Sequence, residues 1–228
     1  MKRTKIICTM GPNTDDEEMM RKLAKAGMDI ARFNFSHGDH EEQKTRMDLL
    51  KKVRKELKLP IAILLDTKGP EIRTGILEGG QKVYLEEGSQ FTLTTKQIEG
   101  NNTRCSQTYK DLPKDVKAGD TILIDDGLIQ LTVEEVTDTD VVCRVVNGGE
   151  LGQKKGINVP NVEVKLPAIT EQDKNDILFG IEQGIDFIAA SFVRNAEAIK
   201  EIKELLRANG GERIDVIAKI ENAEGVHN

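Results

Sequence analysis

Several polar side chains follow the second apolar run of this sequence. The segment is RFNFS, residues 32–36. If strand geometry continues through it, Arg32, Asn34 and Ser36 share one face while the two phenylalanines pack on the other. One cation and two neutral oxygens then face the same space. Two structural roles stay open at this point, Arg32 as a surface ion pair and Ser36 as a helix-capping residue.

A carboxylate ends the next apolar run, residues 61–65. This residue is Asp66, and an unpaired carboxylate is costly in such a position. It should therefore hold a cation or cap backbone amides. Capping is the less attractive role because the residues that follow, from Gly69 onward, have the pattern of β-structure rather than helix.

Lys219 and Glu221 close the last apolar run of the chain. They are two residues apart, so in a strand both side chains point the same way. The pair can be a simple ion pair. It also suits a metal ligand beside a cation that stabilises developing negative charge. The two residues alone do not separate these interpretations.

Taken together, these residues suit phosphoryl transfer. Arg32, Arg73 and Lys219 offer positive charge, and Asp66 and Glu221 offer hard oxygen ligands for a Mg²⁺-type ion. Such groups match a transition state whose charge spreads over the equatorial phosphoryl oxygens. The sequence contains neither a Gly-x-x-x-x-Gly-Lys-Ser/Thr loop nor a Gly-x-Gly-x-x-Gly segment, so neither a P-loop nor a Rossmann nucleotide site is indicated.

The elements that must position these side chains alternate between strand and helix at both ends of the chain. Capping boxes at Thr14/Glu17 and Thr170/Asp173 start two of the predicted helices. This alternation predicts a parallel sheet, whose carboxyl strand ends gather ligands. The predicted strands cover about 5–10, 30–34, 61–65, 186–191 and 214–221, and the predicted helices about 14–27, 40–57, 170–184 and 195–209.

The middle of the chain has a different pattern. Repeated short strands without a convincing helix fill residues 70–167. Asp126-Gly127 and Asn147-Gly148 are dipeptides that tolerate tight hairpin turns. We therefore expect a separate β-domain over 70–167, inserted between α/β segments at 1–69 and 168–228.

Composition excludes several classes of protein. The 228 residues carry a formal net charge of −6, have no Trp and are 4% aromatic, so a nucleic-acid surface is not expected. No run approaches the ~20 apolar residues of a membrane span, and the N-terminus lacks a signal-peptide pattern, which favours a cytoplasmic protein without membrane contact. The three cysteines, Cys8, Cys105 and Cys143, fit reduced thiols buried in strands.

Seven segments carry a resemblance to a known family. In chain order they are TKIICTMGP, ARFNFSHGDH, ILLDTKGPEIRTG, DDGLI, KKGINVP, DFIAASFVR and AKIENAEGV. Together they resemble pyruvate kinase of the bacterial type, from the first residues to the last. The resemblance implies an α/β fold: the first five strands of a (β/α)₈ TIM barrel, with a mobile all-β barrel lid inserted after the third strand.

The resemblance also implies a reaction and its ligands. Phosphoenolpyruvate and ADP would give pyruvate and ATP, with Mg²⁺ or Mn²⁺ and K⁺ as cofactors, in a cytoplasmic enzyme that is a homotetramer at full length. By motif, Arg32 and Lys219 would bind substrate and, with Arg73, act in catalysis, and Ser191 would line the substrate pocket. Nucleotide contacts would come from Arg73, Lys155, His37 and Pro12. The oxygens that bind K⁺ would come from Asn34, Ser36, Asp66 and Thr67. Glu71 resembles the residue that accompanies K⁺ dependence in the family. Glu221 would bind Mg²⁺.

The length fits only part of such an enzyme. The insert takes 98 residues and leaves 130, about half of the ~250 that a complete barrel needs. The resemblance places a second metal carboxylate in an ARGD-like motif beyond Asn228. We therefore expect an N-terminal portion with negligible activity by itself. The alternatives are a non-catalytic module with only nucleotide or cation contacts, and another metal-dependent barrel enzyme, which would not explain GPEIRT and KKGINVP.

Overall fold

The computed structural model describes residues 3–228 and divides into two compact units. One unit runs to Pro70 and continues from Pro167 to Glu221, with Asn228. The other comprises Glu71–Leu166 and Asn222–His227. The first is built on a parallel sheet and the second on a mixed one, so the chain combines an α/β unit with a separate β unit.

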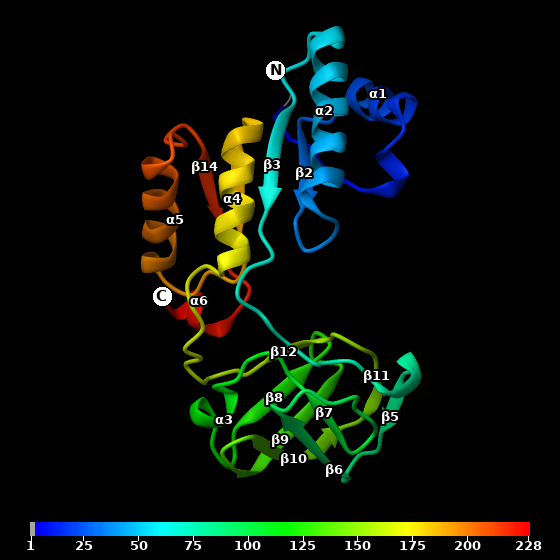
Figure 1. Cartoon of the computed structure of the whole chain (residues 1–228), viewed down its shortest axis with the longest axis vertical. Helices are drawn as coiled ribbons and strands as arrows, with labels where there is room; N and C mark the ends of the chain where they lie inside the picture. The colour runs from blue at the N-terminus through cyan, green and yellow to red at the C-terminus, as the bar shows by residue number, and fades with distance from the viewer. Residues whose placement is uncertain (1–2) are drawn as a thin grey trace. The chain divides into compact units, whose positions relative to one another are not determined.

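Five parallel strands form the sheet of the α/β unit, in the order β1-β2-β3-β13-β14 (Figure 1). The middle strand, β3, is buried along most of its length, as its unbroken apolar sequence predicts. The strands are β1 (Ile7–Met10), β2 (Ile30–Asn34), β3 (Ala62–Asp66), β13 (Phe187–Ala190) and β14 (Asp215–Ala218).

Helices follow the strands and contact one another in the order α1, α2, α4, α5. Their apolar faces and the sheet enclose one core, which includes Phe33, Met47, Leu50 and Ile63. The predicted βα alternation is therefore present on both sides of the insert. The helices are α1 (Glu17–Ala26), α2 (His40–Leu57), α4 (Glu171–Gln183) and α5 (Ala196–Ala208).

One of the two predicted capping boxes is confirmed and the other is wrong. Thr170 and Asp173 form a reciprocal box at the start of α4. Thr14 instead accepts the Gly11 N–H at 2.9 Å and closes the short 3₁₀ turn η1 (Pro12–Thr14). Helix α1 is capped by Asp16, whose Oδ2 accepts the Met19 N–H at 2.9 Å. The cap of α1 is therefore the Asp16 carboxylate, directly before the helix, and not the Thr14 hydroxyl.

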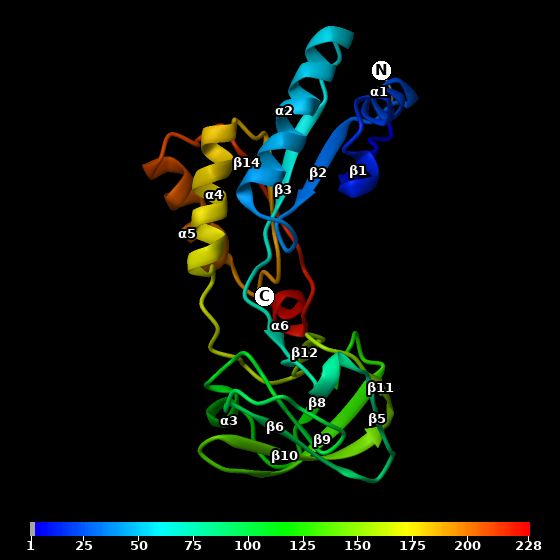
Figure 2. The ribbon, with the colours of Figure 1, turned by 45° about the vertical axis from the view of Figure 1, so that its right-hand side comes forward.

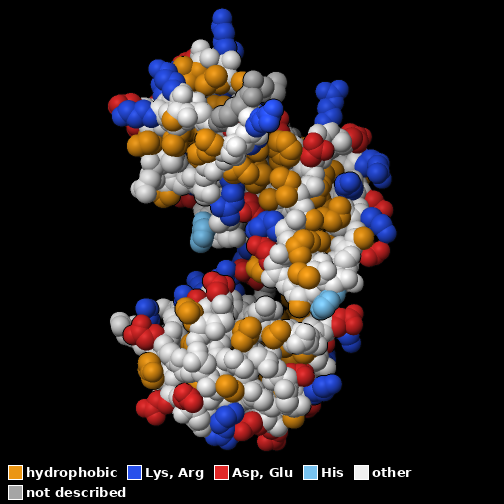
Figure 3. All heavy atoms as spheres, turned by 180° about the vertical axis from the view of Figure 1, so that it is seen from behind, with side chains coloured by type: hydrophobic (Ala, Val, Ile, Leu, Met, Phe, Trp, Pro, Cys, Tyr) orange, Lys and Arg blue, Asp and Glu red, His pale blue; other side chains and the backbone are white. Residues whose placement is uncertain are grey.

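Strands β1 and β14 are the edges of the parallel sheet and carry exposed apolar side chains. Ile7 on β1 is 51% exposed and Ile217 on β14 is 41% exposed. Figure 3 shows apolar side chains at the surface of the α/β unit, beside charged groups. In the described part of the chain this sheet is open, as the predicted five-stranded portion of a barrel requires.

The β unit holds a seven-stranded sheet in the order β4-β12-β8-β9-β10-β6-β7, with a separate pair β11-β5 (Figure 2). All neighbours are antiparallel except β6 and β7. The strands are β4 (Ile72–Arg73), β5 (Val83–Leu85), β6 (Gln90–Thr94), β7 (Arg104–Ser106), β8 (Thr121–Ile124), β9 (Ile129–Val136), β10 (Asp140–Asn147), β11 (Gly149–Leu151) and β12 (Gly156–Asn158).

The two edges of the seven-stranded sheet approach each other. Thr74, after β4, forms an isolated antiparallel bridge with Gln107, after β7. The adjacent Gly75 N–H donates to Ser106 O at 2.7 Å. A Cβ at Gly75 would lie 1.9 Å from Ser106 Oγ, so any larger residue would displace the Ser106 side chain. The sheet is therefore curled into a half-barrel around its own apolar core.

Local predictions for the insert had mixed outcomes. Asp126-Gly127 connects the antiparallel strands β8 and β9 with positive φ angles of 56° and 88°, which confirms a hairpin. Asn147-Gly148 is not a hairpin turn, because β11 after it pairs with β5 rather than with β10. The insert also contains two short helices that were not predicted, η2 (Glu78–Gly80) and α3 (Leu112–Asp115). A further short helix, α6 (Ala223–His227), lies near the end of the chain.

The cysteines are free thiols. Cys105 on β7 and Cys143 on β10 are buried, and burial raises the pKa of each thiol to about 12. Cys8 on β1 is only partly buried. The prediction of strand thiols is confirmed, with complete burial for two of the three. Within residues 3–228 no helix is long and apolar enough to span a membrane.

A buried carboxylate joins α2 to α4. Asp176 accepts a hydrogen bond from His40 Nε2 at 2.6 Å through its Oδ1, and its Oδ2 is buried without a partner. The His40 ring stacks on Phe179, one turn further along α4, with centroids 4.3 Å apart. Burial raises the pKa of the Asp176 carboxyl above its ordinary value of 3.8, and the hydrogen bond from His40 opposes this shift.

This raised pKa predicts a pH dependence of stability. Because the folded state holds the Asp176 proton more tightly than the unfolded state, native stability falls as pH rises from 3.8 through the raised folded pKa. The neutral variant Asp176→Asn lacks this contribution. Urea unfolding of both proteins should therefore show the native chain losing stability relative to the variant as pH rises. A difference that stays constant with pH would contradict the prediction.

Candidate functional site

The carboxylate of Asp66 is the centre of a charged cluster at the carboxyl ends of the parallel strands. Asp66 ends β3 and its side chain is 2% exposed. Its Oδ2 accepts a hydrogen bond from Arg32 Nε at 2.6 Å. Its Oδ1 accepts hydrogen bonds from Lys219 Nζ at 3.1 Å and from Ser191 Oγ at 3.2 Å. One buried carboxylate at the end of β3 thus joins Arg32 within β2 to Ser191 and Lys219, which follow β13 and β14.

The register of the sheet explains this convergence. Asn34 on β2 lies opposite Asp66, and Ala189 on β13 lies opposite it on the other side. Ala190 in turn lies opposite Ala218, the residue before Lys219. Parallel strands in this register end at one edge, so residues far apart in sequence come together there.

Arg32 has a second partner that the sequence did not reveal. Its Nη1 donates to Thr9 Oγ1 at 2.8 Å, and Thr9 lies directly opposite it on β1. The guanidinium is therefore held from two neighbouring strands, β1 and β3. The surface ion pair that stayed open for Arg32 is wrong, because its carboxylate partner is buried.

Lys219 and Glu221 form the ion pair that their spacing allows. Lys219 Nζ lies 3.2 Å from Glu221 Oε1 and 2.9 Å from Ser191 Oγ. The other carboxylate oxygen of Glu221 accepts the Phe192 N–H at 3.0 Å. Phe192 has a φ of 56°, a left-handed backbone that is uncommon outside glycine. The chain turns sharply after β13 and presents this amide to Glu221.

Hydrogen bonds between Thr67 and Ser191 connect the ends of β3 and β13. Thr67 Oγ1 accepts the Ser191 N–H at 3.1 Å and donates to Ala189 O at 3.4 Å. Ser191 Oγ also lies 2.6 Å from Thr67 O. Both side chains are buried, and the Thr67 hydroxyl is engaged with β13.

The remaining predicted residues of this unit lie in loops beside the cluster. Asn34 Oδ1 accepts the Ser36 N–H at 3.0 Å, which forms a local turn. Ser36 does not cap α2, because Asp39 Oδ1 accepts the Glu42 N–H there at 2.9 Å. His37 is exposed after β2 and Pro12 opens η1. Neither is a partner of the Asp66 carboxylate.

The oxygens of this edge are of the kind that hard cations prefer. The set consists of one carboxylate, an amide oxygen and hydroxyls. Its single negative charge suits a monovalent ion such as K⁺, whereas a site with several carboxylates would suit a divalent ion. Across residues 3–228 no group of three or more His, Cys, Asp or Glu side chains is arranged to hold a metal. Glu221, with one oxygen toward Lys219 and the other accepting the Phe192 N–H, is not part of such a group among the described residues.

Two further predicted cations lie in the β unit, Arg73 on β4 and Lys155 immediately before β12. Arg73 on β4 is opposite Gly156 on β12, so Lys155 lies beside it. Arg73 donates from Nη1 to Lys154 O at 2.6 Å and from Nε to Glu71 Oε1 at 2.5 Å. The hydrogen bond that Arg73 donates to Glu71 raises the pKa of its guanidinium, which stays charged.

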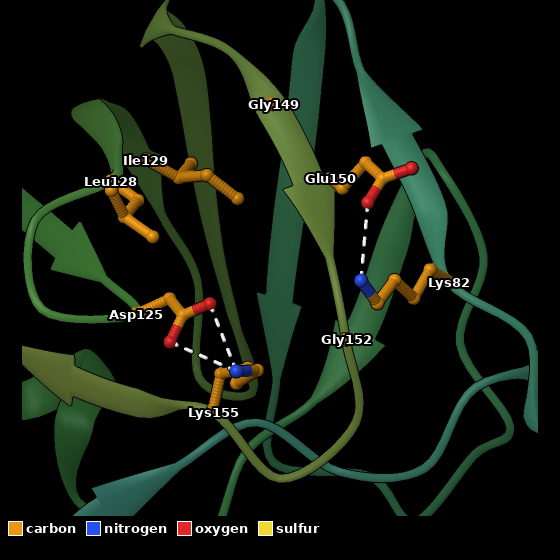
Figure 4. Close-up of a pocket in the computed structure, with 8 residues that line it drawn as sticks. All are labelled: Lys82, Asp125, Leu128, Ile129, Gly149, Glu150, Gly152 and Lys155. Atoms are coloured by element: carbon orange, nitrogen blue, oxygen red, sulfur yellow. Dashed lines mark hydrogen bonds and ion pairs between the residues drawn. The ribbon is translucent and has the colours of Figure 1, made fainter.

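Lys155 lines a pocket of about 240 Å³ in the β unit. Its Nζ lies 3.0 Å from each carboxylate oxygen of Asp125, and a second ion pair, Lys82 with Glu150 at 3.1 Å, lies across the pocket (Figure 4). The aliphatic part of the wall is Leu128 and Ile129. The pocket is thus polar on two sides and places one lysine amine within a charged, partly open space.

Comparison with known proteins agrees with these features. Residues 1–228 match the family described as "Pyruvate kinase, barrel domain". The chain belongs to the pyruvate kinase family. It is 53% identical to the pyruvate kinase of Clostridium acetobutylicum and 49% identical to that of Clostridium perfringens, in each case over 100% of this chain and 48% of the relative. It is 51% identical to the pyruvate kinase of Staphylococcus saprophyticus, over 100% of this chain and 39% of the relative.

The chain therefore spans about half, or less, of the length of these curated pyruvate kinases. Within this span the sequence had indicated most residues of the cluster but not all of its contacts. Thr9 and the Phe192 amide were missed there, and in the β unit Asp125, the partner of Lys155, was missed too. Asp125 and Asp126 are consecutive non-glycine residues with left-handed backbone, φ 55° and 56°. The DDG segment could have signalled that turn, but not its partner Lys155.

Removing the central charge tests the cluster. Asp66→Asn keeps the shape of the side chain but leaves Arg32 and Lys219 without their shared buried carboxylate. We expect a loss of about 2 kcal/mol in the free energy of unfolding, typical of hydrogen bonds to charged groups. The control Asp48→Asn removes an exposed carboxylate of α2 that pairs on the surface, and should change stability by less than about 0.5 kcal/mol. Urea unfolding followed by circular dichroism measures both, and equal losses would contradict the prediction.

Proposed function

We propose that this chain provides the phosphoenolpyruvate-binding part and nucleotide-binding residues of a pyruvate kinase. The reaction transfers the phosphoryl group of phosphoenolpyruvate to ADP and yields pyruvate and ATP. The observation that supports this most directly is the Asp66 cluster, which holds Arg32 and Lys219 at one edge of the parallel sheet. Two fixed cations at one edge suit a substrate that carries both a phosphate and a carboxylate.

Each cation has a separate part in the proposed reaction. Arg32, held by Asp66 and Thr9, would bind the phosphoryl group. Lys219 would stabilise the enolate oxygen that gains negative charge when the P–O bond breaks, and Ser191 would line the pocket beside it. The phosphorus then bonds to an oxygen of the ADP terminal phosphate, and the enolate takes up a proton to become pyruvate.

Four residues would contact the nucleotide by family resemblance: Arg73, Lys155, His37 and Pro12. Arg73 and Lys155 carry positive charges that suit ADP phosphates, and Arg73 would also act on the transferred group. Glu71 and Asp125 hold these cations in place.

Cations complete the proposed site. The oxygens of Asn34, Ser36, Asp66 and Thr67 would hold K⁺, a set with one formal charge, although the Thr67 hydroxyl is engaged with β13. Glu221 would be one carboxylate ligand of Mg²⁺ or Mn²⁺. A bound divalent ion would supply positive charge to the phosphoryl oxygens. The homotetramer expected for the full-length enzyme remains part of this proposal.

A coupled assay tests the function. Purified complete natural polypeptide, with phosphoenolpyruvate, ADP, Mg²⁺ and K⁺, should oxidise NADH through lactate dehydrogenase. Lys219→Met should lower kcat by about 10²- to 10³-fold, the usual cost of removing one group that stabilises an oxyanion. Lys22→Met removes an exposed lysine of α1, away from the proposed site, and is the matched control, expected within about twofold of the native rate.

The outcomes separate the alternatives. No turnover by the complete polypeptide would contradict the proposal. Equal rates for Lys219→Met and native protein would contradict the role of Lys219. The same assay on the 228-residue chain distinguishes a catalytic unit from a module that retains only nucleotide or cation contacts. We expect negligible turnover there, because the residues that the structure describes include no group of three or more His, Cys, Asp or Glu side chains that could hold a metal ion.

A further inference from the structure

A second buried carboxylate lies outside the Asp66 cluster, in the first turn of α4. Asp173 is 1% exposed, and both of its oxygens accept hydrogen bonds. Oδ2 accepts the Thr170 N–H at 2.9 Å and the Thr170 hydroxyl at 2.6 Å. Oδ1 accepts the Gly69 N–H at 2.9 Å, across 104 residues of sequence. Asp173 therefore joins the segment that leaves β3 to the segment that enters α4.

The bond to Gly69 is not needed for helix capping. The reciprocal box between Thr170 and Asp173 already satisfies the start of α4 through Oδ2. Oδ1 is a separate, long-range contact to a backbone amide. An ionised acceptor makes this hydrogen bond stronger than one between neutral groups, and its burial protects it from competition by water.

Gly69 transmits this contact to the cluster. Its φ is 74°, and a Cβ at this position would lie 2.8 Å from Ser191 Cβ and 2.9 Å from Ser191 O. The Gly69 backbone therefore packs directly against Ser191. Ser191 Oγ in turn lies 2.9 Å from Lys219 Nζ and 3.2 Å from Asp66 Oδ1. A short chain of contacts thus links Asp173 to the cation proposed to stabilise the enolate.

We propose that Asp173 is a positioning residue for the phosphoenolpyruvate side of the site, an inference that rests on the proposed function. By holding the Gly69 amide it fixes the backbone after β3 against Ser191. Ser191 then holds Lys219 and Asp66 in their relative positions. Asp173 is a partner neither of Lys219 nor of Arg32, so its effect on the reaction passes through Gly69 and Ser191.

The variant Asp173→Asn separates the two contacts. An asparagine oxygen can replace only one carboxylate oxygen, and the side that accepts two hydrogen bonds, from Thr170, is the more favourable place for it. The amide NH₂ would then face the Gly69 N–H, donor against donor. The control is Asp176→Asn, which makes the same chemical change at another buried carboxylate of α4, one whose hydrogen-bond partner is His40.

The first measurement is amide hydrogen exchange of the complete natural polypeptide, read at Gly69. Exchange there should be at least about tenfold faster in Asp173→Asn than in native protein, because the amide loses its buried acceptor. It should be unchanged in Asp176→Asn. Equal protection of Gly69 in all three proteins would overturn the proposal without bearing on the function.

The second measurement is a pair of Michaelis constants from the coupled assay. In Asp173→Asn the KM for phosphoenolpyruvate should rise about tenfold while the KM for ADP stays within about twofold, since Arg73 and Lys155 have their own supports. A merely structural role would lower only the apparent kcat, because unfolded molecules change neither KM. Asp176→Asn should leave both KM values unchanged.

Other outcomes are equally decisive. An unchanged KM for phosphoenolpyruvate, or the same rise in Asp176→Asn, would overturn the proposal. Absence of turnover in the native polypeptide would instead overturn the function on which it rests. If Asp173→Asn does not fold, Gly69→Ala tests the same contact from its other side, because the added Cβ would press on Ser191. It should also raise the KM for phosphoenolpyruvate selectively, and an unchanged value would overturn the proposal.

Discussion

The burial of one negative charge at the end of β3 governs the arrangement of the α/β unit. An isolated carboxylate at the Asp66 position would be strongly unfavourable, and two cations with a hydroxyl offset that cost. The partners come from β2 and from the segments after β13 and β14, so the carboxylate is satisfied only when these strands lie in the observed order and register. The need of the buried Asp66 carboxylate for partners therefore also brings Arg32 and Lys219 together.

A similar electrostatic balance occurs in the β unit by a different route. There Arg73 lies on β4, and Lys155 immediately precedes β12, the strand that pairs with β4. Local carboxylates hold both cations in place, Glu71 for Arg73 and Asp125 for Lys155. Each of the four proposed cations therefore has a carboxylate partner.

Periodicity and local hydrogen-bonding patterns predicted much of the fold. The βα alternation, the buried character of β3, the Thr170 capping box and the Asp126-Gly127 hairpin all follow from residues close together in sequence. The two local predictions that were wrong, the Thr14 cap and the Asn147-Gly148 hairpin, each concerned a segment with more than one possible hydrogen-bond partner. Thr14 and Asp16 both offer a cap for α1, and Asn147-Gly148 suits a hairpin equally well whether or not β11 returns to β10. Such alternatives differ by a few tenths of a kcal/mol to about 1 kcal/mol, so packing decides them.

The sequence by itself determined which side chains could do chemistry: a carboxylate at the end of a buried strand, basic residues near strand ends, and motifs that resemble one family over the whole chain. Tertiary structure decided which of them meet. Only the parallel register brings Lys219 to Asp66 across 153 residues of sequence, and only the packing of Gly69 on Ser191 connects Asp173 to them. The physical reason is that these contacts depend on strand order and on the close approach of backbones, which spacing along the chain does not specify.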